Sequence, residues 1–183
     1  MPASLRRSRP ALPRFAVAWF PRFKGLEAVE DFRRRHDPTA AFIPAHLTLV
    51  FPFPTALKRL QVETHVKRVA ARWPPIPVTF PGVRLHANEF VFLVAGRGAE
   101  SIAGLHDRLY TRSFLPYLRR DIAYEPHITI ARDPSLPRVE AALAEAREAF
   151  RREAVDVIRE VTLLAVGADG RIDRLSDIAL HTA

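Results

Sequence analysis

The sequence predicts a bilobal α+β fold, in which two pseudo-symmetric, mainly antiparallel sheets with flanking helices surround a central groove. Strand-like segments occur beside segments whose apolar residues recur at the 3.6-residue spacing of helices. In addition, a His-aliphatic-Thr-aliphatic motif occurs twice, as HLTL beginning at His46 and as HITI beginning at His127. Each copy follows a helical segment and precedes a proline and another helix, which indicates two similar halves with no linker between them.

The first half contains two strands and two helices. RFAVAWF at 14–20 has the composition of a short buried strand, and a helix is expected over 25–36. The basic run of that helix, Arg33-Arg34-Arg35, fits a solvated helix end. After the first motif strand, a helix from about 55 to 73 is expected from the apolar residues on one of its sides: Leu57, Leu60, Val66, Val69 and Trp73.

The second half repeats this order and adds a hairpin. Residues 76–96 are expected to form strand, turn and strand, with the turn at 87–89. Gly98 opens a helical segment, the second motif strand follows, and the next helix carries a clear apolar stripe: Val139, Ala142, Leu143, Ala146 and Phe150. Asp169-Gly170 marks the turn of a closing hairpin.

Length and composition fit a single globular domain. We expect residues 13–183 to form it and residues 1–12 to be a disordered basic tail. A hydrophobic fraction of 48% with 26% charged residues excludes wholesale disorder. No apolar run approaches the roughly 20 residues of a membrane span, and FAVAWF is too short for the apolar region of a signal peptide. A monomeric, cytoplasmic protein that binds no membrane is therefore expected.

Charge and cysteine content limit the chemistry. A formal net charge of +8 and a pI near 10.9 favour a polyanionic partner, either a nucleic acid or a smaller phosphate ester. An arginine-heavy proteome would give the same charge balance. The chain has no cysteine, which excludes disulfides, thiolate metal sites and a cysteine nucleophile. Neither motif has a carboxylate beside its histidine, so a zinc site is not expected either.

Both motifs fit strands that present reactive groups on one face. Alternation directs the aliphatic residues (Leu47, Leu49, Ile128 and Ile130) into the core, and it places each histidine and its threonine on the other face, about 6.6 Å apart. One imidazole can then take a proton from an attacking water or hydroxyl while the other gives a proton to the leaving oxygen. The threonine hydroxyls can donate hydrogen bonds to a phosphoryl group. This chemistry requires no metal ion or other cofactor.

HLTL and HITI resemble the paired motifs of the 2H phosphoesterase superfamily, and EPHITIAR is closest to its branch of 2′-5′ RNA ligases and RNA 2′,3′-cyclic phosphodiesterases. The resemblance implies that His46 and His127 are the acid–base pair and that Thr48 and Thr129 hold the phosphate. It also implies a bilobal fold and an activity that opens 2′,3′-cyclic phosphates to 2′-phosphates, or joins or cleaves 2′-5′ linkages. One departure is that the first motif continues as VFPFP, where the ligase branch often has Leu-Gly.

Two further residues are predicted to bind substrate. Arg132 carries a guanidinium suited to phosphate, although strict alternation turns it away from the His127 face. Tyr124 is placed to stack on a base at the groove mouth, with packing as the alternative. His86, beside the turn at 87–88, is expected to be a surface histidine, with a position that reaches the groove as the alternative. The other histidines lack a partner pattern and are expected to have no role: His36, His65, His106 and His181.

The sequence thus predicts a metal-independent phosphoesterase that acts on a 2′,3′-cyclic phosphate or a 2′-5′ phosphodiester of RNA or an oligonucleotide. Hydrolysis is favoured over ligation because water is always present and a ligase must hold a second strand. The alternatives are an enzyme for a small cyclic phosphate, such as one derived from ADP-ribose, and an RNA-binding module without turnover. The RNA enzyme should lose affinity steeply with salt, whereas the small-substrate enzyme should show little salt dependence. The binding module should hold RNA equally well after His46→Ala.

Overall fold

The computed structural model describes residues 12–181, so the expected tail at 1–12 lies, apart from Leu12, outside the described residues. The elements, in chain order, are β1 (Arg14–Trp19), α1 (Leu26–His36), the short 3₁₀ helix η1 (Pro38–Ala41), β2 (Leu47–Pro54), α2 (Arg59–Ala70), β3 (Ile76–Phe80), β4 (Gly82–His86), β5 (Phe90–Val94), α3 (Ala99–Leu109), η2 (Arg112–Tyr117), β6 (His127–Arg132), α4 (Leu136–Ala149), β7 (Ala154–Ile158), β8 (Glu160–Val166) and β9 (Ile172–Ala179).

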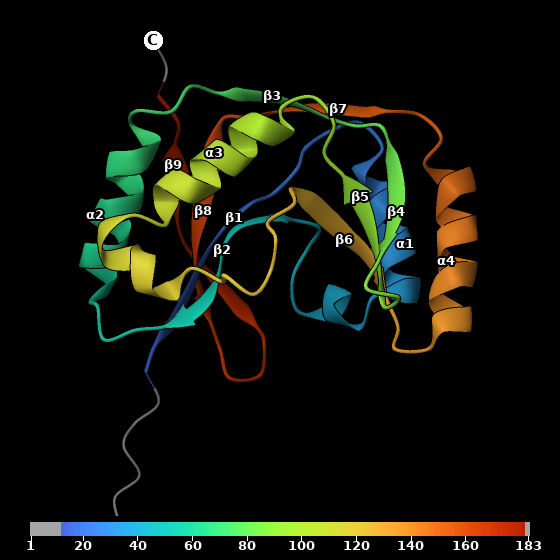
Figure 1. Cartoon of the computed structure of the whole chain (residues 1–183), viewed down its shortest axis with the longest axis horizontal. Helices are drawn as coiled ribbons and strands as arrows, with labels where there is room; N and C mark the ends of the chain where they lie inside the picture. The colour runs from blue at the N-terminus through green and yellow to red at the C-terminus, as the bar shows by residue number, and fades with distance from the viewer. Residues whose placement is uncertain (1–11, 182–183) are drawn as a thin grey trace, which may run out of the picture.

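Seven strands form one antiparallel sheet in the order β4-β5-β6-β2-β1-β8-β9, while β3 pairs with β7 in a separate two-stranded sheet. Figure 1 shows α2 and α3 with β1, β2, β8 and β9 on one side of the molecule, and α1 and α4 with β4, β5 and β6 on the other. The predicted α+β class with flanking helices is confirmed. The strands of the two halves meet where β2 lies beside β6.

The order of elements repeats once along the chain. The series β1-α1-β2-α2-β3-β4 is matched by β5-α3-β6-α4-β7-β8, and the strand pairing repeats with it. Thus β1 lies between β2 and β8, and β5 lies between β6 and β4. The helix before each motif strand crosses to the opposite half, because α1 packs on β6 and α3 packs on β2. Among the strands of residues 12–181, only β9, at one edge, has no counterpart within this repeat.

The two faces of the sheet differ in the size of their side chains. One face joins the large core, in which the four aliphatic residues of the motifs are fully buried as predicted: Leu47, Leu49, Ile128 and Ile130. Helices α2 and α3 contribute to the same core through residues such as Val66 and Leu105. The other face of β1 carries Ala16 and Ala18, which pack only against Leu164 and a few partly buried neighbours. These small side chains leave a hollow on that face.

Three elements depart from expectation. Helix α2 begins at Arg59 rather than 55, because the Thr55 hydroxyl accepts the Leu57 N–H at 3.1 Å and holds a turn there. Pro81 separates β3 from β4, so 76–96 contains three strands instead of two. Strand β7 was not expected at all. Among the described residues, none of the helices is long and apolar enough to cross a membrane.

Candidate active site

The two motif strands meet at a single residue pair, Leu47 with Ile128, which we call the seam. Continuing the antiparallel register by one residue each way sets His46 opposite Thr129 and Thr48 opposite His127. Side chains that face each other across such a pair lie about 5 Å apart at Cβ. This register places at the seam the two histidines and two threonines that the sequence singled out, with each histidine opposite the threonine of the other motif.

Each motif strand has a β-bulge at the fourth motif position. In β2 the partners of Ala18 and Val17 are Thr48 and Val50, so Leu49 is the extra residue. In β6 the partners of Phe92 and Val91 are Thr129 and Ala131, so Ile130 is the extra residue. A bulge inserts one residue into one strand and thereby resets the alternation that follows.

The bulge in β6 corrects the expected direction of Arg132. Ala131 pairs with the fully buried Val91 and faces the core, and Arg132 pairs with Phe90 on the other face. Arg132 therefore returns to the face of Thr129 and lines the same cavity. Its guanidinium lies 5.2 Å from the centre of the Phe90 ring, and its Nε donates to the Glu89 carboxylate at 3.0 Å. Strict alternation gave the wrong side because it did not allow for the extra residue.

Both imidazoles are oriented by the same local hydrogen bond. His46 Nδ1 lies 2.8 Å from the Pro44 carbonyl oxygen, and His127 Nδ1 lies 2.6 Å from that of Glu125. A carbonyl oxygen only accepts, so Nδ1 carries the proton in both rings. The Nε2 atom of each neutral imidazole is then left as the proton acceptor. One bond to the residue two positions earlier thus fixes the tautomer in both motifs.

Burial lowers the pKa of both histidines. For His46 the pKa falls to about 4, mainly through desolvation, with further lowering by the positive charges of Arg33 and His127. The pKa of His127 is also lowered by desolvation, while the Glu125 carbonyl and carboxylate act in the opposite direction. In the ligand-free protein the depressed pKa of each imidazole favours its neutral form at pH 7.

A buried charge network holds the segment before His46. The Arg33 side chain, 1% exposed, donates to Asp37 at 2.8 Å and to the Ile43 carbonyl at 3.1 Å. Glu30 lies 3.3 Å from the Arg33 guanidinium and accepts the Ala45 N–H at 2.7 Å. The expectation that Arg33 belongs to a solvated helix end is wrong. The sequence signal for this ion pair was the spacing of four residues between Arg33 and Asp37, which brings the two side chains together on a helix.

Beyond the seam, aromatic side chains form hydrogen bonds with the backbone groups of β2 that β6 does not pair. The Thr48 carbonyl accepts the Tyr124 hydroxyl, and the Leu49 carbonyl accepts His106 Nδ1, both at 2.8 Å. The Tyr110 hydroxyl accepts the Phe51 N–H at 2.9 Å. These partners are needed because β2 pairs with β6 only at the seam, and buried backbone groups require hydrogen bonds. His106 therefore has a structural role that the sequence did not indicate.

Tyr124 lies within this group rather than at an open groove mouth. Its ring stacks on His106 with 3.6 Å between centroids and 9° between planes, and it is partly buried. Its hydroxyl is already bonded to the Thr48 backbone. This is the packing alternative considered from the sequence, and the bond to the Thr48 carbonyl links Tyr124 to the motif strand β2.

A different set of residues supports His127. Phe92 stacks on its ring with 3.5 Å between centroids, and His86 also stacks on Phe92, at 4.7 Å. Glu125, which holds His127 through its carbonyl, forms an ion pair with Arg84. His86 is thus a member of an aromatic column beside the site, close to where the sequence placed it.

The groove beside the seam is a cavity of about 500 Å³. His46, Thr48, Thr129 and Arg132 contribute polar groups to its lining, and apolar residues contribute much of the rest: Ala16, Ala18, Phe42, Ile43, Leu164, Val166 and Ile172. Neither threonine hydroxyl has a hydrogen-bond partner within residues 12–181, so both are free to donate to a ligand. No three His, Asp or Glu side chains of that range are grouped in a way that would hold a metal ion.

Comparison with known proteins gives consistent results. A family model described as the 2′-5′ RNA ligase superfamily matches residues 21–170. A protein of Geobacillus thermodenitrificans named "Putative phosphoesterase" is 31% identical over 166 residues, which cover 88% of this chain and 84% of that protein.

Solved structures show the same fold. Two structures of E. coli LigT, in complex with NADP+ and with 3′-AMP, are each 23% identical and cover 93% of this chain and 99% of LigT, with TM-scores of 0.58 and 0.57. The structure of TT0787 from Thermus thermophilus has a TM-score of 0.60 at 17% identity, and covers 92% of this chain and 98% of that one.

Proposed function

This chain belongs to the 2′-5′ RNA ligase superfamily, and from that premise we propose that it opens 2′,3′-cyclic phosphates, or cleaves 2′-5′ phosphodiesters, of RNA or oligonucleotides without a metal ion. The LigT-type fold and the named relative support a phosphoesterase. The observation that carries the finer proposal is the arrangement at the seam. There, His46 lines one cavity together with the Thr48 and Thr129 hydroxyls, which have no partner within residues 12–181, and the register of the seam sets His127 opposite Thr48. The Nδ1 bond of each imidazole leaves its Nε2 as the proton acceptor.

In the proposed reaction, water attacks the phosphorus of the cyclic phosphate. The Nε2 atom of one histidine takes a proton from that water while the Nε2–H of the other gives a proton to O3′. A new P–O bond forms, the P–O3′ bond breaks, and a 2′-phosphate with a free 3′-hydroxyl results. Thr48 and Thr129 donate to the non-bridging oxygens, where charge must be held during in-line displacement. Arg132 adds a positive charge on the same side.

Proton uptake accompanies substrate binding in this scheme. Both imidazoles favour the neutral form before binding because burial lowers each pKa. A phosphate anion beside them favours the charged form of one ring, so its pKa rises in the complex. Tyr124 acts as a positioning residue, since its hydroxyl fixes the Thr48 backbone rather than touching the substrate.

A second candidate substrate is a cyclic phosphate of nucleotide size. A cavity of about 500 Å³ with an apolar wall is large enough for one nucleotide rather than a long strand. E. coli LigT has been solved with 3′-AMP and NADP+, which are ligands of that size. With such a substrate, activity should vary little with salt, whereas several phosphate contacts to RNA would make it fall steeply.

The test is incubation with a short RNA ending in 2′,3′-cyclic phosphate, in the presence of EDTA. The 2′-phosphate should form with the wild type and with His181→Ala, which removes an exposed histidine outside the groove. His46→Ala and His127→Ala should each reduce the rate by about 10²–10⁴-fold. If wild type and both variants bind the RNA equally and none turns it over, the RNA phosphoesterase proposal is wrong and a binding module is supported.

A further inference from the structure

A second cavity lies between α2 and α3, on the opposite face of the sheet from the groove. Its volume is about 400 Å³, and four arginines near the C-terminal ends of the two helices line it: Arg68, Arg72, Arg108 and Arg112. Helices α2 and α3 pack on the large core, whereas the groove opens on the face that carries Ala16 and Ala18. The cavity is therefore separate from the proposed catalytic site.

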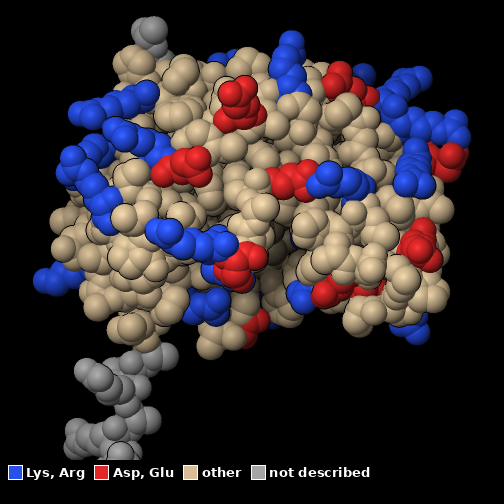
Figure 2. All heavy atoms as spheres, viewed as in Figure 1, with Lys and Arg blue, Asp and Glu red and all other residues tan. Residues whose placement is uncertain are grey.

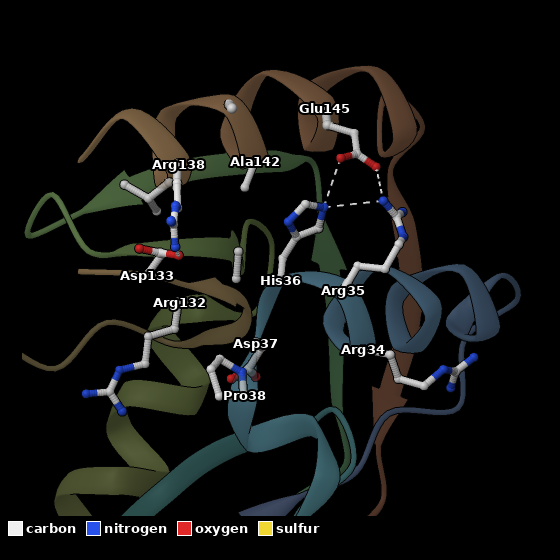
Figure 3. Close-up of a pocket in the computed structure, with 13 residues that line it drawn as sticks. Arg34, Arg35, His36, Asp37, Pro38, Arg132, Asp133, Arg138, Ala142 and Glu145 are labelled. Carbon is white, nitrogen blue, oxygen red and sulfur yellow. Dashed lines mark hydrogen bonds and ion pairs between the residues drawn. The ribbon is translucent and has the colours of Figure 1, made fainter. Parts of the chain in front are cut away.

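In the cavity between α1 and α4, by contrast, arginines are paired with carboxylates (Figure 3). There, Arg35 and His36 both bind the carboxylate of Glu145, with 2.9 Å between His36 Nε2 and its nearer oxygen. Arg138 lies 3.8 Å from an oxygen of Asp133 on the facing side. The positive charges of that cavity are balanced by carboxylates of the same chain.

The arginines of the α2–α3 cavity have no such partners. Within residues 12–181, no carboxylate oxygen lies within 4.0 Å of Arg68, Arg72, Arg108 or Arg112. Figure 2 shows Lys and Arg side chains gathered at the left of the view, over α2 and the end of α3. The dipole of each helix stabilises cations near its C-terminus by a modest amount. It does not account for four that converge on one cavity, where like charges repel unless an anion is bound.

One ring nitrogen of a buried histidine in the same cavity has no hydrogen-bond partner within the described residues. His65 is 3% exposed, and its Nε2 donates to the Leu109 carbonyl at 2.8 Å. Its Nδ1 is buried and has no partner within the described residues. Unsatisfied buried nitrogens are rare and destabilising. A group that meets Nδ1 must bring a hydrogen of its own, or the ring must take up a proton.

We propose that the α2–α3 cavity binds a phosphate group, as inorganic phosphate or as a phosphate monoester. Phosphate is an anion whose charged oxygens match the guanidinium fork of arginine. The second pKa of a phosphate monoester is near 6, and that of inorganic phosphate lies closer to neutrality, so around neutral pH either one holds or exchanges the proton that His65 Nδ1 requires. The ligand is non-catalytic here, because the described lining of the cavity contains His65 as its one histidine and none of the four motif residues at the seam. The proposal does not depend on the activity assigned to the groove.

The test is a nuclear magnetic resonance titration of the imidazole nitrogens of His65 with inorganic phosphate at pH 7, at constant ionic strength. The His65 resonances should change in a saturable manner, and Arg72→Gln/Arg108→Gln should weaken the apparent affinity by at least about tenfold. Arg34→Gln/Arg147→Gln removes two exposed arginines elsewhere and should leave the titration unchanged. Sulfate, which carries no proton at this pH, should produce a smaller change than phosphate.

Further arms identify the source of the phosphate. AMP and a short RNA with a 5′-phosphate are compared with inorganic phosphate, and the same RNA with a 5′-hydroxyl is the control. Preference for the 5′-phosphorylated RNA over its control would place an RNA end in the cavity, and binding of inorganic phosphate alone would indicate a free anion. The proposal is overturned if none of these probes shifts His65 saturably, or if the double arginine variant responds as the wild type does.

Discussion

The two motif strands perform the same local task with different supports. Both have a bulge at the fourth motif position and a histidine whose Nδ1 donates two residues back. Around His46, however, the support is a buried ion network that includes Arg33, whereas around His127 it is the stacked ring of Phe92. The difference indicates that the backbone geometry of the motif is what the repeat retains, and that its surroundings are free to diverge.

The largest effect should come from breaking the ion network on the His46 side. Arg33→Met leaves the carboxylates of Asp37 and Glu30 without their partner, and a broken buried pair costs about 3–5 kcal/mol. Urea unfolding should show this loss, while Arg34→Met, at an exposed neighbouring position, should change the free energy of unfolding by less than about 0.5 kcal/mol. Equal values for the two variants would contradict the buried network.

The pH dependence of stability should separate the two histidines. Below pH 6.5 an unfolded chain protonates His46, but the folded protein resists protonation until about pH 4. The free energy of unfolding should therefore fall as the pH drops through this window, by up to about 3 kcal/mol from His46. His46→Gln removes the His46 imidazole, so it should reduce the slope of the free energy of unfolding against pH more than His127→Gln does. Other buried histidines, His65 and His106, contribute equally to all three proteins and cancel in the comparison.

The two threonines offer a test of the symmetry itself. Thr48→Val and Thr129→Val should each lower kcat/KM by about tenfold to hundredfold, because each removes one donor to the phosphoryl oxygens. Unfolding should be almost unchanged, since neither hydroxyl has a partner within residues 12–181. A large loss at one threonine and none at the other would show that the two halves do not share the phosphate.

A smaller effect should follow from Tyr124→Phe. It removes the donor to the Thr48 carbonyl and should cost about 1–2 kcal/mol of stability, together with a loss of kcat at unchanged KM. Tyr117→Phe is the matched control, because its hydroxyl meets Thr55 far from the seam and should affect stability alone. If both variants leave kcat at the wild-type value, Tyr124 has only a packing role.

Much of this arrangement could be predicted from the sequence because its signals are local. The strand alternation of HLTL and HITI placed four aliphatic residues in the core, and the doubled motif indicated two similar halves. The repeat also predicts a strand that the local pattern does not show. Because β3 follows α2, a matching strand is expected after α4, and β7 is that strand. Its sequence, AVDVI, is too short and too mixed to stand out alone.

The remaining features depend on contacts between distant segments. The bulge that turns Arg132 into the groove depends on how Val91 and Phe92 pair with β6, and β6 alone does not reveal it. Arg33 is buried because the chain folds back at Ile43, and His106 finds its partner 57 residues away at Leu49. Such roles follow from tertiary packing, which a periodicity argument does not contain.

The seam has a mechanical consequence. Because one residue pair, Leu47 with Ile128, joins the two halves of the large sheet, any rotation of one half against the other has its natural axis there. Displacement grows with distance from an axis, so the histidines next to the seam move least. Arg132, four residues beyond Ile128, and the turn at Asp169–Gly170 also line the groove, and such a rotation would move them more. The groove could thus widen or narrow around a ligand while the spacing of its reactive groups stays nearly constant.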